Sequence, residues 1–194
     1  NKLEQLFNAG ALGVCIDIAH GHSKVIIDLI SKIKKAFPDK EVIAGNICSE
    51  EAYIDLVNAG VDAVKVGVGP GAACTTRIVT GFGVPQFTAI YNIAQARNKL
   101  LSQLQVPIIA DGGIRNSRDV ALALAAGANS VMIGNLFSKT LESASNKYYK
   151  DKLDKYNPIL NLQEIYNKYE NNFEIYSHYR GQASKNFQKE YFGN

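Results

Sequence analysis

The sequence predicts an α/β protein, and more closely part of a (β/α)8 TIM barrel, from its strand pattern and spacing. Five short apolar runs recur, and each ends in a small or polar residue. Runs of this length that are rich in Val and Ile are typical of parallel strands buried on both faces. The runs end at residues 17, 45, 67, 111 and 134, so the intervals are 28, 22, 44 and 23 residues. This is the spacing of β/α repeats with one enlarged interval, in which we expect the chemistry.

Helical patterns fall between the predicted strands. Residues 24–36 place apolar side chains at i, i+3 and i+4, which is typical of a helix with one buried face. Residues 49–59 begin with Ser49 as a helix cap, followed by two acidic residues in the first turn. A third helix is predicted over 117–126, ending at Gly127 as its C′ residue. This alternation is compatible with either a doubly wound sheet or a barrel.

The positions of polar residues favour the barrel. The glycine-rich loop 67–71 has no G-x-G-x-x-G pattern, and no apolar helix start follows it. Polar residues instead end several different strands, at Asp17, Asn46, Asp111 and Asn135. The strand ends of a barrel converge on one mouth, which is where barrel enzymes carry their active sites. A barrel has eight strands and only five are visible, so we interpret them as strands four to eight.

Composition excludes several classes of protein. The chain has 194 residues, 46% of them hydrophobic, and a net charge of +3, which suits a domain with a real core and does not indicate a nucleic-acid partner. Its three Cys are scattered without a C-x-x-C pair, which argues against a disulfide framework or a zinc site. No apolar run approaches the ~20 residues of a membrane span. These observations predict a cytoplasmic protein with no membrane partner.

The chain changes composition near residue 138. Of the 16 Gly, 14 lie before it, and eight of the ten Tyr lie after it. We therefore predict that residues 1–138 are the C-terminal part of the barrel, and that 139–194 hold the last barrel helix, an insertion and a segment that closes the active site. The only Met is Met132, and a barrel usually takes ~250 residues. We expect three further strands to precede this sequence, and an open five-stranded piece to be unstable alone because its sheet edges are exposed.

Cys74 is the strongest candidate for a nucleophile. It lies in a loop of small residues, GPGAACTT, where backbone N–H groups and a nearby cation favour the thiolate. A free Cys is more often a small buried hydrophobe. We expect that ordinary role for Cys15, inside an apolar strand, and for Cys48, beside a helix cap, but not for Cys74.

Other polar residues have a functional and a plainer interpretation. Thr76 can polarise a substrate group or merely satisfy a loop backbone group. Asp111 can accept two hydrogen bonds from the hydroxyls of a ribose, or simply form a turn before a helix. Gly134 and Asn135, at the last strand end, offer backbone N–H groups to a phosphate, and the last loops of a barrel are its usual phosphate site.

Three residues are expected to have no catalytic role on their pattern alone. His20 and His22 resemble metal ligands but have no third ligand pattern, so solvated loop histidines are the better interpretation. Glu142 is predicted to lie a turn or two into the helix that follows the last strand, where glutamates are usually solvated.

Six segments of the sequence form a recognisable set. They are DIAHGHS (17–23), VIAGN (42–46), AVKVGVGPGAACTTRIVTGFGVPQ (63–86), IIADGGIRN (108–116), SVMIGNLFSKTLES (130–143) and YRGQAS (179–184). They occur in order through nearly the whole chain, and together they are highly specific. The set resembles the inosine monophosphate dehydrogenase / guanosine monophosphate reductase family.

The resemblance implies a (β/α)8 barrel that binds a purine nucleotide and a nicotinamide cofactor. Cys74 matches the family's nucleophile, which attacks C2 of the purine to form a covalent thioimidate-type intermediate. Sulfur addition makes this poor electrophile tetrahedral, so that ammonia or hydride can leave. Thr76 and Glu142 match the pair that handles protons in the reductases while the 2-amino group is lost.

The resemblance also implies binding residues. Asp111 matches the ribose-binding carboxylate, and Asp17 matches the residue that contacts the nicotinamide ribose. The loop 69–74 resembles a monovalent-cation site, so K⁺ is expected on its backbone carbonyls. The cation ligands are Gly69, Gly71 and Cys74; further substrate positions are Gly113, Gly134, Asn135, Tyr179, Gly181, Gln182, Ala183 and Ser184; further cofactor positions are Ala19 and Asn46.

Details of the sequence favour one member of the family. Ala72 stands where the family often has a phosphate-binding Ser, and 36 residues separate Glu142 from Tyr179. The dehydrogenases hydrolyse their intermediate with an Arg-Tyr pair, which residues 185–194 lack, and the TGFG and AS-x-x-FQK segments look more like some bacterial reductases. We therefore predict a GMP reductase that converts GMP to IMP and ammonia with NADPH. The alternative is IMP dehydrogenase, which oxidises IMP to XMP with NAD.

Two further interpretations stay open. One is a non-catalytic, nucleotide-binding barrel remnant. The other is a generic phosphate-binding barrel enzyme such as an isomerase, which leaves the Cys-x-Thr loop unexplained. The family resemblance suggests a homotetramer.

Overall fold

The computed structural model describes residues 2–74, 76–140, 142–143, 147–149, 152–154, 175–177 and 179. The chain divides into two compact units. The first comprises residues 1–71 and 75–132, and the second comprises residues 72–74 and 133–194. Within the described part of the chain, no helix is long and apolar enough to cross a membrane.

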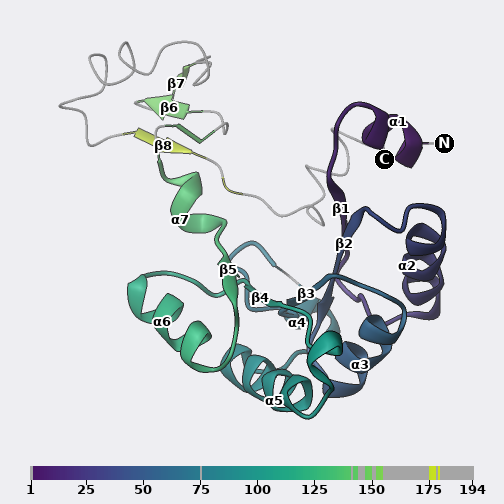
Figure 1. Cartoon of the computed structure of the whole chain (residues 1–194). Coiled ribbons are helices and arrows are strands. Elements are labelled where there is room, and N and C mark those ends of the chain that lie inside the picture. The colour runs from purple at the N-terminus through teal and green to yellow at the C-terminus, as the bar shows by residue number, and fades with distance from the viewer. Residues whose placement is uncertain are drawn as a thin grey trace. The chain divides into compact units, whose positions relative to one another are not determined.

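Five parallel strands form the sheet of the first unit (Figure 1). Each strand pairs with the next one along the chain, so the spatial order is the chain order. A doubly wound sheet reverses its strand order at a switch point, and this sheet has no reversal. The sheet is therefore that of a partial (β/α)8 barrel, as the sequence predicts. The strands are β1 (Gly13–Asp17), β2 (Glu41–Ile47), β3 (Ala63–Val66), β4 (Ile108–Asp111) and β5 (Ser130–Met132).

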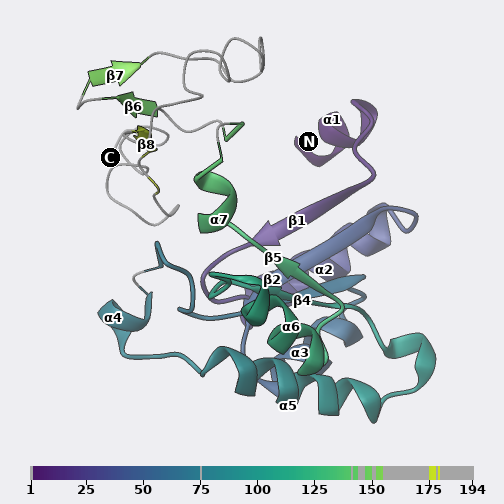
Figure 2. The same ribbon diagram turned by 90° about the vertical axis from the view of Figure 1, so that its left-hand side faces the viewer.

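The helices that connect these strands lie along one face of the sheet (Figures 1 and 2). The connecting helices are α2 (Lys24–Ala36), α3 (Glu50–Asn58), α5 (Gln86–Asn98) and α6 (Ser117–Ala125). Doubly wound sheets carry helices on both faces, whereas a barrel carries them all on its outside. The predicted helices over 24–36, 49–59 and 117–126 are confirmed, but α5 is missed because alanines make up much of its buried face and weaken its apolar pattern. Three shorter elements are α1 (Lys2–Asn8), α4 (Thr76–Thr80) and the 3₁₀ turn η1 (Ser102–Leu104).

The ends of α6 show how local sequence sets its boundaries. Its cap is Asn116, one residue before the predicted start, and the Asn116 side chain accepts a hydrogen bond from the backbone N–H of Asp119 at 3.2 Å. At the other end Gly127 has φ +111°. Its N–H donates to Leu124 O at 3.0 Å, which satisfies one of the last carbonyls of the helix. The predicted C′ glycine is therefore confirmed.

The core lies between the helices and the central strands. Val42, Val64 and Ile108 are fully buried on the sheet, and Ile30 and Ile93 are fully buried on α2 and α5. The edge strand β1 is much less covered.

The expectation that Cys15 is a buried hydrophobe is wrong, because this edge strand leaves Cys15 exposed. Neighbouring protein atoms still displace part of the water around its sulfur and raise the pKa of the thiol. Cys48 is half-buried rather than buried, and burial raises the pKa of its thiol too.

The second unit contains a short helix and a small antiparallel sheet. The helix is α7 (Asn135–Ser138), and the strands β6 (Lys147–Tyr149), β7 (Lys152–Asp154) and β8 (Ile175–Ser177) pair in the order β7-β6-β8. The sequence pattern does not predict these strands. Glu142 lies in an exposed turn after α7 rather than inside a helix, because α7 ends at Ser138.

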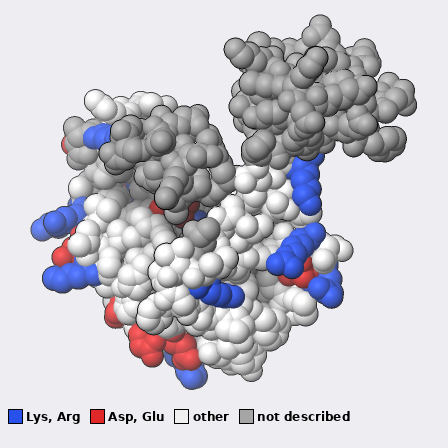
Figure 3. Space-filling view, turned by 180° about the vertical axis from the view of Figure 1, so that it is seen from behind, with Lys and Arg blue, Asp and Glu red and all other residues white. Residues whose placement is uncertain are grey.

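Charge on the surface is mixed. On the face drawn in Figure 3, the described Lys and Arg side chains occur in small groups, with acidic groups and uncharged residues between them. That face of the described residues therefore carries no continuous basic surface of the kind that binds a nucleic-acid backbone.

Candidate active site

Three charged side chains meet where the strands of the first unit end. Lys65 of β3 donates to Asp17 Oδ1 of β1 at 2.9 Å and to Asp111 Oδ2 of β4 at 2.8 Å. The Lys65 side chain is 1% exposed, whereas those of Asp17 and Asp111 are 44% and 21% exposed. We call Asp17, Lys65 and Asp111 the carboxylate–lysine cluster.

The two carboxylates keep Lys65 charged. Burial is the largest influence on its pKa and lowers it, but the hydrogen bonds and charges of Asp111 and Asp17 together outweigh burial. The pKa of Lys65 is therefore raised, and the side chain is an ammonium ion at neutral pH. With both carboxylates ionised, the cluster has a net charge of −1.

Gly45 lets the Lys65 side chain cross the sheet. In the strand register, Gly45 of β2 stands between Asp17 of β1 and Lys65 of β3. A Cβ added at Gly45 would lie 2.5 Å from Lys65 Cβ and 2.7 Å from its carbonyl oxygen. Only a residue without a side chain leaves room for Lys65 to pass over β2 and reach Asp17.

Two amide side chains support the cluster. Asn46 Nδ2 donates to Asp111 Oδ2 at 2.9 Å and to Gly67 O at 2.8 Å. Gln86 Nε2 donates to Val66 O at 2.9 Å and to Asp111 O at 3.2 Å. The oxygens Asn46 Oδ1 and Gln86 Oε1 are buried, and neither has a hydrogen-bond partner among the described residues.

The loop after β3 packs against the loop after β4. Gly112 has φ +94°, and a Cβ added there would lie 2.9 Å from Pro70 Cγ and 3.0 Å from the backbone N of Gly71. Arg77 braces the same loop, because its Nη2 donates to Val68 O at 3.2 Å and to Val84 O at 2.8 Å. The glycines therefore allow the loop after β3 and the loop after β4 to approach each other closely.

The structure brings together some of the predicted site residues. Asp17 and Asp111 both accept hydrogen bonds from Lys65, and Asn46 Nδ2 donates a hydrogen bond to Asp111. The other predicted residues of the first unit lie in segments that follow these strands. Ala19 is exposed after β1, and Gly69 and Gly71 lie in the loop after β3. Thr76 begins α4, and Gly113, with φ +81°, follows β4.

The remaining predicted residues belong to the second unit. Cys74 is half-buried, and Asn135 begins α7. Gly134 lies against Tyr179, because a Cβ added to Gly134 would meet the Tyr179 hydroxyl. Gly181, Gln182, Ala183 and Ser184 lie outside the described residues. The roles predicted for all of these residues, including the K⁺ site on Gly69, Gly71 and Cys74, stay predictions.

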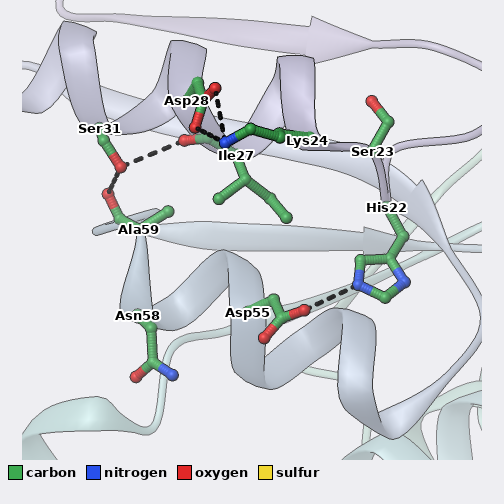
Figure 4. Close-up of a pocket in the computed structure, with 9 residues that line it drawn as sticks. All are labelled: His22, Ser23, Lys24, Ile27, Asp28, Ser31, Asp55, Asn58 and Ala59. Atoms are coloured by element: carbon green, nitrogen blue, oxygen red, sulfur yellow. Dashed lines mark hydrogen bonds and ion pairs between the residues drawn. The ribbon is translucent and has the colours of Figure 1, made fainter.

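A separate polar pocket of about 440 Å³ lies on α2 and α3 (Figure 4). His22 is not simply solvated as predicted, because its Nε2 lies 2.9 Å from Asp55 Oδ2 on α3. His20 is exposed. The pocket contains no member of the carboxylate–lysine cluster.

Sequence reasoning misses Lys65, Gly45 and Gln86. The signal for Lys65 is present, since a lysine in the middle of the apolar run Ala63–Val66 must be buried if the strand is. A buried lysine needs a carboxylate partner, and Asp17 and Asp111 are the strand-end carboxylates available.

The fold agrees with a comparison to known families. A model of the IMP dehydrogenase / GMP reductase domain matches residues 1–188. The chain belongs to the IMP dehydrogenase / GMP reductase family. This is a family of oxidoreductases, and the family membership predicted from the sequence is confirmed.

Several relatives are about half identical in sequence. Inosine-5′-monophosphate dehydrogenases of Borreliella burgdorferi, Nitrosopumilus maritimus and Aquifex aeolicus are 54%, 54% and 50% identical over 146, 142 and 149 residues. The matches cover 75%, 73% and 77% of this chain, but 35%, 29% and 30% of the relatives. The chain thus spans about a third of the length of the curated relatives it matches.

The cluster has the chemistry to hold a nicotinamide dinucleotide. Among the described residues, Asp17 Oδ2 has no hydrogen-bond partner, and the side chain is 44% exposed. An exposed carboxylate oxygen fits the hydroxyls of a ribose, and the unpaired Asn46 Oδ1 fits an N–H or O–H donor. The residues present therefore fit the cofactor that the family resemblance implies.

Proposed function

We propose that the protein oxidises the C2 position of inosine monophosphate with NAD, as an IMP dehydrogenase. The observation that carries the proposal is the name shared by relatives 50–54% identical to this chain, which is inosine-5′-monophosphate dehydrogenase. This is the alternative of the sequence prediction, and the relatives support it better than GMP reductase.

The proposed chemistry begins at Cys74. The Cys74 thiol releases its proton to solvent, its sulfur bonds to C2 of IMP, and the hydrogen on C2 departs as a hydride, which leaves a thioimidate between Cys74 and the purine. A bound NAD supplies the acceptor for that hydride. Water then adds to C2 and the Cys74 thiol leaves, so the product is XMP and C2 has been oxidised by two electrons. In the GMP reductase alternative, Thr76 and Glu142 are the proposed proton carriers while the 2-amino group is lost.

The cluster supplies orientation in this proposal. Asp111 uses Oδ2 for Lys65 and Asn46, and Oδ1 has no hydrogen-bond partner among the described residues. That oxygen is proposed to accept the hydrogen bonds of the nucleotide ribose, and Asp17 Oδ2 those of the cofactor ribose. Two ligands held by groups fixed to one sheet have their reacting atoms positioned before the reaction.

Absorbance of the reduced nicotinamide tests the proposal. The full-length protein is incubated with IMP and NAD, and separately with GMP and NADPH. A rise in this absorbance in the mixture of IMP and NAD supports IMP dehydrogenase. A fall in the second supports GMP reductase, the candidate that the TGFG and AS-x-x-FQK segments favour. Nucleotide binding without turnover in either mixture supports the non-catalytic alternative, and the absence of both refutes all three.

Cys74→Ala tests the nucleophile. We expect it to abolish turnover while IMP binding stays within a few-fold of the unmodified protein. Cys48→Ala is the matched control, since Cys48 is also half-buried but lies outside the glycine-rich loop. Turnover retained by Cys74→Ala, or lost equally in both variants, refutes the assignment. A homotetrameric assembly stays a separate proposal, which light scattering can test.

A further inference from the structure

Lys65 is the feature that the proposed chemistry leaves unused. It is the one charged residue that is buried among the described residues, with 0% of its surface exposed. A buried ammonium ion is costly unless it is paired, and replacing such a pair by apolar residues often stabilises a protein. Stability alone therefore does not account for a lysine at this position.

The way its partners bind Lys65 points to a role in ligand binding. The ammonium takes Asp17 Oδ1 and Asp111 Oδ2, one oxygen from each carboxylate. The other oxygens, Asp17 Oδ2 and Asp111 Oδ1, have no hydrogen-bond partner among the described residues. Each carboxylate is thus anchored at one oxygen and available at the other.

A second lysine–aspartate pair in the same unit shows the contrast. Lys34 Nζ of α2 binds both oxygens of Asp62, at 3.1 and 3.0 Å, and also Lys40 O at 3.1 Å. Asp62 Oδ2 additionally accepts from the backbone N of Val42 at 2.7 Å. Both oxygens of Asp62 are therefore used within the protein, which is the arrangement of a purely structural ion pair.

We propose that Lys65 is a positioning residue that fixes the Asp111 carboxylate for the hydroxyls of the nucleotide ribose. The Lys65 Nζ–Asp111 Oδ2 contact of 2.8 Å, together with that of Asn46 at 2.9 Å, sets the rotation of the carboxylate and leaves Oδ1 for the ligand. This inference rests on the proposed function, because it takes the nucleotide to be the ligand.

The test compares nucleotides that differ only in the ribose hydroxyls. Dissociation constants of IMP and of 2′,3′-dideoxyinosine monophosphate are measured by calorimetry for the full-length protein, Lys65→Met and Lys34→Met. The unmodified protein is expected to prefer IMP. In Lys65→Met, the affinity for IMP should fall about tenfold or more, whereas the affinity for the dideoxy nucleotide should change little. The ratio of the two dissociation constants should therefore approach one. Lys34→Met should unfold at lower urea concentration but keep the full preference.

Each outcome decides the proposal. A folded Lys65→Met protein that keeps the preference for IMP overturns it, as does an equal loss of affinity for both nucleotides. If Lys65→Met does not fold, Lys65→Gln, which keeps a hydrogen-bond donor without the charge, takes its place. If neither neutral variant folds, the lysine is needed for the fold and the positioning role is overturned. Failure of the proposed function is distinguishable, because it shows as a lack of turnover of IMP with NAD by the unmodified protein, whereas failure of the positioning role shows in the dissociation constants of the Lys65 variants.

Discussion

Replacing Gly45 by Ala perturbs the position over which Lys65 crosses the sheet. The added Cβ would lie 2.5 Å from Lys65 Cβ and 2.7 Å from Lys65 O, well inside the ordinary contact distance of 3.4 Å. These atoms belong to or adjoin the backbone of β3, so no side-chain rotation relieves the contact. The strands β2 and β3 must separate locally, and overpacking of this kind costs about 1–3 kcal/mol. We expect the free energy of unfolding to fall by about 2 kcal/mol.

Urea unfolding followed by circular dichroism measures this change, with an unchanged dependence on denaturant as the check that both states keep their compactness. The sign of the change in the free energy of unfolding distinguishes crowding from free space at Gly45. Where an added methyl group has room, Gly→Ala stabilises a protein by about 0.4–1 kcal/mol, because the unfolded chain becomes stiffer. A Gly45→Ala variant as stable as the unmodified protein, or more stable, would refute the crowding of Gly45 against Lys65. IMP binding should weaken in the same variant, since displaced Lys65 no longer holds Asp111 in place.

Three further changes test other parts of the structure. Tyr53→Phe removes a hydroxyl that donates to Val106 O at 2.8 Å and should cost about 1–3 kcal/mol in urea unfolding. Burial raises the pKa of Tyr53 to about 12, so its stabilisation is complete below the ordinary value near 10 and is lost as the pH rises toward 12. The difference in free energy of unfolding between Tyr53→Phe and the unmodified protein should therefore shrink over that range. A difference that stays constant contradicts a buried Tyr53 hydroxyl with a raised pKa. Ser49→Ala removes the cap that accepts from Ala52 N at 3.3 Å and should cost about 1 kcal/mol, most of which Ser49→Asn should restore. Asp111→Asn should weaken the binding of IMP and of inosine by the same factor in calorimetry, because both share the ribose; a change confined to IMP would contradict ribose binding there.

Much of the fold follows from the sequence because its elements are set by local patterns. The strands at 41–47 and 63–66 are nearly continuous apolar runs, and α3 begins one residue after the predicted cap at Ser49. The helix α5 is missed because Ala89, Ala94 and Ala96 form much of its buried face. Small residues bury well but carry a weak apolar signal, so packing rather than pattern fixes that helix.

The site is only partly predictable for a different reason. Asp17 and Asp111 can be recognised because a polar residue at the end of an apolar strand is conspicuous. The apolar run around Lys65 indicates that this lysine is buried. Its path over Gly45 to Asp17 depends on the register that aligns residues of β1, β2 and β3, and that register has no signal along the chain. Exposure of Cys15 has the same origin, since only the strand order shows that β1 lies at an edge of the sheet.

The charge of the cluster determines which part of a nucleotide it can hold. Two carboxylates and one ammonium leave a net charge of −1 at the strand ends. A phosphate placed about 4 Å from that charge would be repelled by about 4 kcal/mol at an effective dielectric constant of 20, which is roughly a thousandfold in affinity. Ribose hydroxyls carry no charge and donate hydrogen bonds, so they gain from the same carboxylate oxygens that repel a phosphate. The charge of the cluster therefore suits the proposed contact with the sugar of a nucleotide, and the same proposal requires the phosphate to bind other groups of the protein.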